Sequence, residues 1–125
     1  MRAAGYEVIV LAGSFQPSAG VPTVDNSQSW FTVSNTGVGT YTIQLKDRFF
    51  QVYSAHIDVS SFGGVADYIA FFQPATGVSL DSLVANTGAL PIKIYTKAGV
   101  AADPAADASN TVYFTLVLKN STVTG

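Results

Sequence analysis

Apolar and polar residues alternate with a period of two in the middle of the chain. In the segment TYTIQL, Tyr41, Ile43 and Leu45 share one face, and threonine and glutamine share the other. Side chains of a β-strand point alternately to its two faces, so this pattern predicts a strand with one buried face. Gly37 and Gly39 precede it, and glycine allows the positive φ of a tight turn. We therefore expect a hairpin with the preceding segment, WFTVSN.

Other segments show related strand patterns. Residues 6–11 and 67–73 are apolar on both faces. The first pattern predicts a strand that is central or covered on both sides, and the second predicts a strand that is central or at an interface. Residues 90–97 alternate isoleucine with lysine, and their proline and lysines predict a protected edge strand. The closing segment TVYFTLVLKNSTV, residues 111–123, is the longest cleanly alternating strand. One of its faces carries Val112, Phe114, Leu116 and Leu118.

The alternation slips by one residue within the segment FFQVYSAHIDVS. Phe50 and Val52 share one parity, whereas Ala55 and Ile57 share the other. One extra residue in a strand shifts the side chains that follow it to the opposite face. We therefore predict a β-bulge near Tyr53 and Ser54.

The remaining segments carry turn residues. Residues 14–29 contain three breakers, Pro17, Gly20 and Pro22, and predict a long loop with one short extended piece. Residues 77–88 fit a short helical turn about as well as a strand, and we treat them as a loop with a short strand. Asp103 and Pro104 mark a further turn.

These elements predict an all-β fold. Seven or eight strands at roughly even spacing, with no convincing amphipathic helix, favour an antiparallel β-sandwich or a jelly-roll-like barrel. A chain of 125 residues can close one core, so we expect a single domain over residues 1–125, with residues 1–5 as an N-terminal arm.

Charge narrows the range of functions. Charged residues make up 11% of the chain and hydrophobic residues 48%, whereas an average domain has about 25% charged residues. Either serine, threonine and asparagine cover the surface, or copies of the chain bury apolar surface against each other, and we favour the second interpretation. A net charge of −2 with scattered basic residues argues against nucleic-acid binding.

Nothing in the sequence predicts membrane association. No apolar run approaches the length of a membrane helix, which is about 18 residues. The apolar stretch near the N-terminus has the length of a strand rather than the pattern of a signal peptide, so we expect a protein made in the cytosol.

Catalytic and metal-binding patterns are equally weak. The chain has no cysteine, and its one histidine, His56, shares a strand face with Asp58 without further partners. No serine lies in a nucleophile elbow, and the glycines before Tyr41 precede a strand rather than a helix that could bind phosphate. Asp103 and Asp107 fit a solvated turn better than a calcium site. We expect no enzymatic activity, no cofactor and no metal.

Two stretches, GVGTYTIQLKDRF and TVYFTLVLKNSTV, resemble segments of small virion proteins of tailed bacteriophages. Those proteins often carry the motif G-x-G-x-Y-T-[IV]-x-L-x-D-x-F/Y, and often end in a strand of the type V-x-L-V-L-[KR]-N-S. A loop with Asp-Pro before that strand also recurs among them. The resemblance covers about half of the chain. The matching positions are Gly37, Gly39, Tyr41, Thr42, Ile43, Leu45, Asp47 and Phe49, then Leu116, Val117, Leu118, Lys119, Asn120 and Ser121.

The resemblance implies a capsid decoration protein, also called a cement protein. Such an all-β protomer forms a homotrimer on the outer capsid surface, binds the major capsid protein and stabilises the shell. It would be made in the host cytoplasm and would need no active site. We expect loop 14–29 and the N-terminal residues to contact the shell. The expected interface residues are Phe15, Pro17, Pro22, Trp30 and Phe62.

Two other functions stay open. A receptor- or glycan-binding head domain of a phage fibre or spike would show an exposed Trp30, Tyr95 or Phe62 that stacks on a sugar. A tail-tube or head-completion protein would form rings and usually carries long hairpins, which the pattern does not predict. For Trp30 itself, a core position at the end of a strand is favoured over an exposed contact residue.

Overall fold

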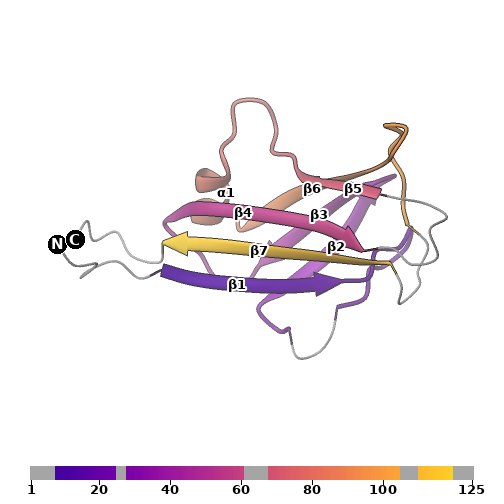
Figure 1. Ribbon diagram of the computed structural model, residues 1–125. Helices are drawn as coiled ribbons and strands as arrows, with labels where there is room; N and C mark the ends of the chain where they lie inside the picture. Colours follow the sequence, from indigo (N-terminus) through magenta and orange to yellow (C-terminus); the bar gives the residue numbers. More distant parts are fainter. Residues whose placement is uncertain (1–7, 25–27, 61–67, 105–109, 120–125) are drawn as a thin grey trace.

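The chain folds into two antiparallel β-sheets that pack face to face (Figure 1). The computed structural model describes residues 8–24, 28–60, 68–104 and 110–119. One sheet has the order β1-β7-β4, and the other has the order β2-β3-β6-β5. The predicted all-β sandwich is confirmed. No helix in these described residues is long and apolar enough to cross a membrane. The strands are β1 (Val8–Phe15), β2 (Phe31–Gly37), β3 (Thr40–Leu45), β4 (Gln51–Ser60), β5 (Tyr68–Phe72), β6 (Ala89–Thr96) and β7 (Thr111–Lys119).

The core lies between the sheets and follows the alternation in the sequence. The faces that carry Tyr41, Ile43 and Leu45 in β3 and Phe114 in β7 are both buried. Phe114 meets Phe31 of the opposite sheet edge to face, with 5.0 Å between the ring centroids. Aromatic pairs in this geometry stabilise a fold beyond the area that they bury. The two predicted faces therefore meet through aromatic rings.

Gly13 permits this close approach. A Cβ atom at this position would lie 2.7 Å from Cζ of Phe114 and 2.9 Å from Cε1 of Phe31. Strand β1 can therefore cross beneath both rings only without a side chain at residue 13. The sequence suggested that β1 ends here, but the strand continues to Phe15.

Three strand positions differ from the prediction. In the described part of the chain, β1 and β5 are the outer strands of their sheets, so the predicted central position is wrong. The alternatives, a covered β1 and a β5 at an interface, stay predictions. β6 lies between β3 and β5, although its proline indicated an edge. The carbonyl of Pro91 accepts a hydrogen bond from Gln73 N at 2.9 Å, so the backbone of Pro91 faces β5 just beyond the last residue pair of the β5–β6 ladder. Proline has no N–H, and at this position the ladder loses no hydrogen bond because of it.

The predicted bulge in β4 is confirmed, because the pairing with β7 shifts between Val52 and Ser54. The N–H of Val52 donates to a carboxylate oxygen of Asp81 at 2.7 Å. Asp81 belongs to helix α1 (Leu80–Asn86), so the helix satisfies a backbone group at the bulge.

Helix α1 corrects the loop expected at residues 77–88. The Ser79 side chain caps its N-terminus by accepting from Ser82 N at 3.2 Å. Gly88 follows its C-terminus with φ +71° and donates to Leu83 O at 2.6 Å. Both are ordinary helix-end signals, but apolar spacing over so short a segment does not separate helix from strand.

Filling the space at Gly13 is expected to destabilise the fold. Gly13→Ala pushes a methyl group against Phe114 and Phe31, and overpacking of this kind costs about 1–3 kcal/mol of unfolding free energy. Urea unfolding followed by fluorescence measures the loss. Gly20→Ala is the matched control, because its Cβ meets nothing closer than 3.8 Å. Equal stability of the two variants would contradict the role assigned to Gly13.

Candidate functional site

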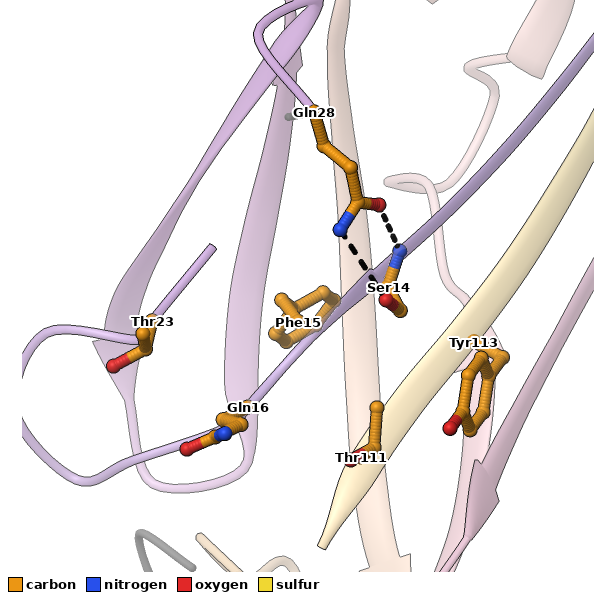
Figure 2. A pocket seen from close by; sticks show the side chains of 7 residues that line it. All are labelled: Ser14, Phe15, Gln16, Thr23, Gln28, Thr111 and Tyr113. Carbon is orange, nitrogen blue, oxygen red and sulfur yellow. Dashed lines mark hydrogen bonds between the residues drawn. The ribbon is translucent and has the colours of Figure 1, made fainter. Parts of the chain in front are cut away.

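A polar pocket lies at the end of the three-stranded sheet where β1 ends and β7 begins (Figure 2). Its volume is about 370 Å³, which lies within the usual range for small-molecule pockets. The described lining residues carry hydroxyl, amide and aromatic groups, and none of them is charged. The lining residues are Ser14, Phe15, Gln16, Thr23, Gln28, Thr111 and Tyr113.

Gln28 forms one wall of the pocket and is held in place by β1. Its Oε1 accepts from the backbone N–H of Ser14 at 2.7 Å, and its Nε2 donates to Ser14 Oγ at 3.3 Å (Figure 2). Gln16 and Thr23 form an isolated antiparallel bridge beside it, with N–O distances of 2.9 and 3.0 Å. The predicted loop 14–29 therefore contains strand-like pairing that builds the pocket.

Tyr113 forms the outer rim of the pocket and is 54% exposed. Across β7 and β4, the register places it opposite Asp58, which is also exposed. On the other side, it pairs with Ser14 of β1. The rim thus combines an exposed aromatic ring with one neighbouring carboxylate.

A second polar cluster surrounds Asp103, at the turn expected from Asp103 and Pro104. One carboxylate oxygen, Oδ1, accepts from Gly39 N at 2.9 Å, Asn35 Nδ2 at 3.0 Å and the Tyr41 hydroxyl at 2.9 Å. Burial raises the pKa of Tyr41 well above its ordinary value, and the hydrogen bond and charge of Asp103 raise this pKa further. These internal hydrogen bonds tie the β2–β3 hairpin to the turn, and give Asp103 a structural role in place of a solvated turn.

Exposed apolar side chains form two surfaces on the outer faces of the two sheets. The first, the β1–β7 strip, consists of Val8, Val10, Ala12 and Val117. Val8 and Val10 are 55% and 62% exposed, and Val10 pairs with Val117. The strip continues toward Phe50, whose ring lies over Lys119, with Nζ 5.1 Å from the centroid.

The second surface, the β5–β6 patch, consists of Ile69, Phe71 and Tyr95. Ile69 and Phe71 are about half exposed, and the Phe71 and Tyr95 rings lie 6.2 Å apart. Ile69 is the register partner of Tyr95. The strip and the patch therefore lie on opposite sheets.

The structure places four of the five expected interface residues. Phe15 is 2% exposed and belongs to the core. Pro17 and Pro22 are buried as well. Trp30 is half-buried, and its ring lies 4.4 Å from that of Phe31 and 5.7 Å from that of Phe114. Phe62 lies outside the described residues.

The favoured core position of Trp30 agrees with these contacts. Phe15 lines the floor of the pocket, whereas Pro17, Pro22 and Trp30 are not among its lining residues. Phe15 belongs to the core cluster and Trp30 packs against it, so these two aromatic residues hold the chain to the core at either end of loop 14–29.

The residues considered for chemistry do not assemble into an active site. His56 and Asp58 are exposed on the outer face of β4, the polar strand face that the sequence indicated. Asp107 lies outside the described residues. Among the described residues, no group of three metal-ligating side chains comes together.

The sequence did not predict that Gln28, Thr111 and Tyr113 line one pocket. The alternation did place Tyr113 on the solvent-facing side of the last strand. No sequence signal, however, brings that side to residues 14–28, because the pairing of β1 with β7 joins segments almost one hundred residues apart.

Comparison of the chain with family models, curated proteins and solved structures finds no match.

The Tyr41–Asp103 hydrogen bond is expected to give stability that depends on pH. Tyr41→Phe removes this bond and should lower the unfolding free energy by about 1–2 kcal/mol at neutral pH. The folded pKa of Tyr41 is raised, whereas the unfolded chain titrates near pH 10. The stabilisation is therefore complete below about pH 10 and declines above it, because ionisation favours the unfolded chain.

The stability difference between wild type and Tyr41→Phe should accordingly shrink between neutral pH and about pH 10.5. Urea unfolding at both pH values measures it. Tyr53→Phe, at an exposed tyrosine, serves as the control and should change the unfolding free energy by less than about 0.5 kcal/mol at neutral pH. A difference for Tyr41→Phe that grows with pH would show that the sign is wrong.

Proposed function

We propose that this chain is a capsid decoration protein of a tailed bacteriophage, which coats the outer capsid surface as a homo-oligomer. The observation that carries the proposal is the pair of separate apolar surfaces, the β1–β7 strip and the β5–β6 patch, on opposite sheets. A decorating protomer needs two such surfaces, one for its own copies and one for the major capsid protein. The resemblance of two strands to small virion proteins supports the same function.

We assign the β1–β7 strip to contacts between copies because the edge of β1 is unprotected. Ser14 N–H donates to Gln28 and so points away from β7. Backbone direction alternates with a period of two, so the amides of Val10 and Ala12 point to the same side. The strand VIVLAGSF contains neither charge nor proline, the usual protection of an edge strand.

The β5–β6 patch is the surface that we assign to the shell. Its rings Phe71 and Tyr95 are of the residue types that are enriched at the centres of protein interfaces. Lys93 lies beside it and donates to Thr40 Oγ1 at 2.7 Å, which fixes its ammonium group at the rim. The trimeric state is part of the proposal and derives from the resemblance.

Such a protein stabilises the shell through the apolar surface that it buries in its contacts. Each apolar contact contributes about 25 cal/mol per Å² before the cost of association is subtracted. Several protomers that act together bind the shell more tightly than one, because the second contact is intramolecular once the first has formed. The low charge of the chain, 11%, suits surfaces that are buried in an assembly.

Copy number tests the proposed function. Quantitative mass spectrometry of virions from the source of this sequence should find the chain in amounts comparable to the major capsid protein. A much smaller amount would favour a fibre, spike or tail position. Its absence from virions would overturn the proposal.

Charge in the β1–β7 strip is expected to prevent self-association. Val10→Lys places an ammonium group in the strip and beside the open edge of β1, and should weaken association at least about tenfold. Sedimentation equilibrium of the purified chain measures this change. Thr32→Lys is the control, because Thr32 is exposed on the outer face of the other sheet. A monomeric wild type, or a Val10→Lys variant that associates normally, would contradict the assignment.

A further inference from the structure

The pocket beside Tyr113 has the features of a binding site for a neutral sugar. We propose that it binds one pyranose residue of a neutral glycan, through hydrogen bonds from its amides and hydroxyls and through stacking on Tyr113. The inference is independent of capsid decoration. The pocket adjoins the strip, because Ala12 of the strip lies two residues, about 7 Å, before Ser14 along β1.

The hydrogen-bonding groups of the lining match a polyol. Sugar hydroxyls both donate and accept, and amides and hydroxyls offer both functions in one side chain. The pocket combines two glutamine amides, Gln16 and Gln28, with three aliphatic hydroxyls, those of Ser14, Thr23 and Thr111.

Gln28 is pre-organised for this purpose. Its two hydrogen bonds to Ser14 use one lone pair of Oε1 and one hydrogen of Nε2, so a second lone pair and a second hydrogen remain. The bonds also fix the orientation of the amide, which reduces the entropy lost when a ligand binds.

Tyr113 provides the apolar contact that a pyranose ring needs. A sugar presents C–H groups on one face and hydroxyls at its rim, and a tyrosine likewise combines an apolar ring with a polar tip. The Tyr113 ring is 54% exposed at the edge of the pocket. The aromatic residues expected from the sequence do not lie here: Trp30 packs on Phe114, Tyr95 lies on the other sheet, and Phe62 is outside the described residues.

Charge selects a neutral ligand over an anionic one. Among the described residues, no lysine or arginine lines the pocket, so this part of the chain offers an acidic sugar no cationic partner there. Asp58, exposed and opposite Tyr113 in the register, would repel a carboxylate or a sulfate. The same carboxylate can accept hydrogen bonds from sugar hydroxyls.

Nuclear magnetic resonance tests the proposal with the full chain. Amide spectra are recorded during titration with the methyl glycosides of glucose, galactose and N-acetylglucosamine, and with glucuronic acid as the charged counterpart. At least one neutral glycoside should shift the backbone amides of Ser14, Gln16 and Tyr113 and the side-chain amide of Gln28. The expected dissociation constant is on the order of 1 mM, as is usual for a single small ligand in an open site.

Variants distinguish the contribution of the Tyr113 ring to sugar binding from that of the other lining residues. Tyr113→Ala should weaken binding at least about tenfold, whereas Tyr113→Phe keeps the ring and should stay within about threefold of wild type. Tyr53→Ala is the matched control, because Tyr53 is 46% exposed and lies outside the pocket. Gln16→Ala removes one amide from the wall and should weaken binding severalfold, which provides a second test that leaves Tyr113 in place.

Three results would overturn the proposal: no shift at these amides with any neutral glycoside, wild-type affinity of both Tyr113→Ala and Gln16→Ala, or equal binding of glucuronic acid. None of these results bears on self-association. The capsid proposal and the sugar site can therefore fail separately.

Discussion

The contact between Phe31 and Phe114 is the interaction on which the rest of the structure depends. It joins the two sheets, and Trp30 packs on both rings. This contact requires glycine at position 13 of the neighbouring strand β1, because a side chain there would collide with the two rings. Once β1 is held in this position, its last residues run past the core toward Gln16 and Thr23. The packing of the core thus determines where the polar pocket forms.

Away from the aromatic core, carboxylate groups form hydrogen bonds that hold two further regions of the fold together. Asp103 collects three donors at the tip of the β2–β3 hairpin, and Asp81 supplies an acceptor for the N–H of Val52 at the bulge. Buried side-chain polar atoms in the described residues all have partners. Hydrogen bonds within the described chain therefore satisfy its buried polar side chains, whereas the functional proposals rest on outward-facing groups of β1 and of the pocket.

The outer faces of the two sheets carry both polar and apolar side chains. Most outward positions of β2 and β3 carry threonine, serine or glutamine, which need no partner protein. By contrast, β1 and β5 expose valine, isoleucine and phenylalanine, and both are edge strands. A surface covered by small polar residues and a surface buried by oligomerisation were alternatives in sequence. The structure shows small polar residues on the outer faces of β2 and β3 and exposed apolar residues on β1 and β5. The apolar residues gather where a sheet can be extended or covered.

The sequence by itself determined the strands, the buried faces of β3 and β7, the β2–β3 turn and the bulge near Tyr53, because each follows from the alternation of neighbouring side chains. Tertiary structure decided which strands lie at an edge, and that depends on contacts between distant segments: β1 carries the apolar pattern of a central strand, and Pro91 lies in an internal one. It also buried Phe15 and brought Gln28 to Tyr113. The physical reason is that periodicity specifies which face of a strand is apolar, whereas only packing specifies what covers that face.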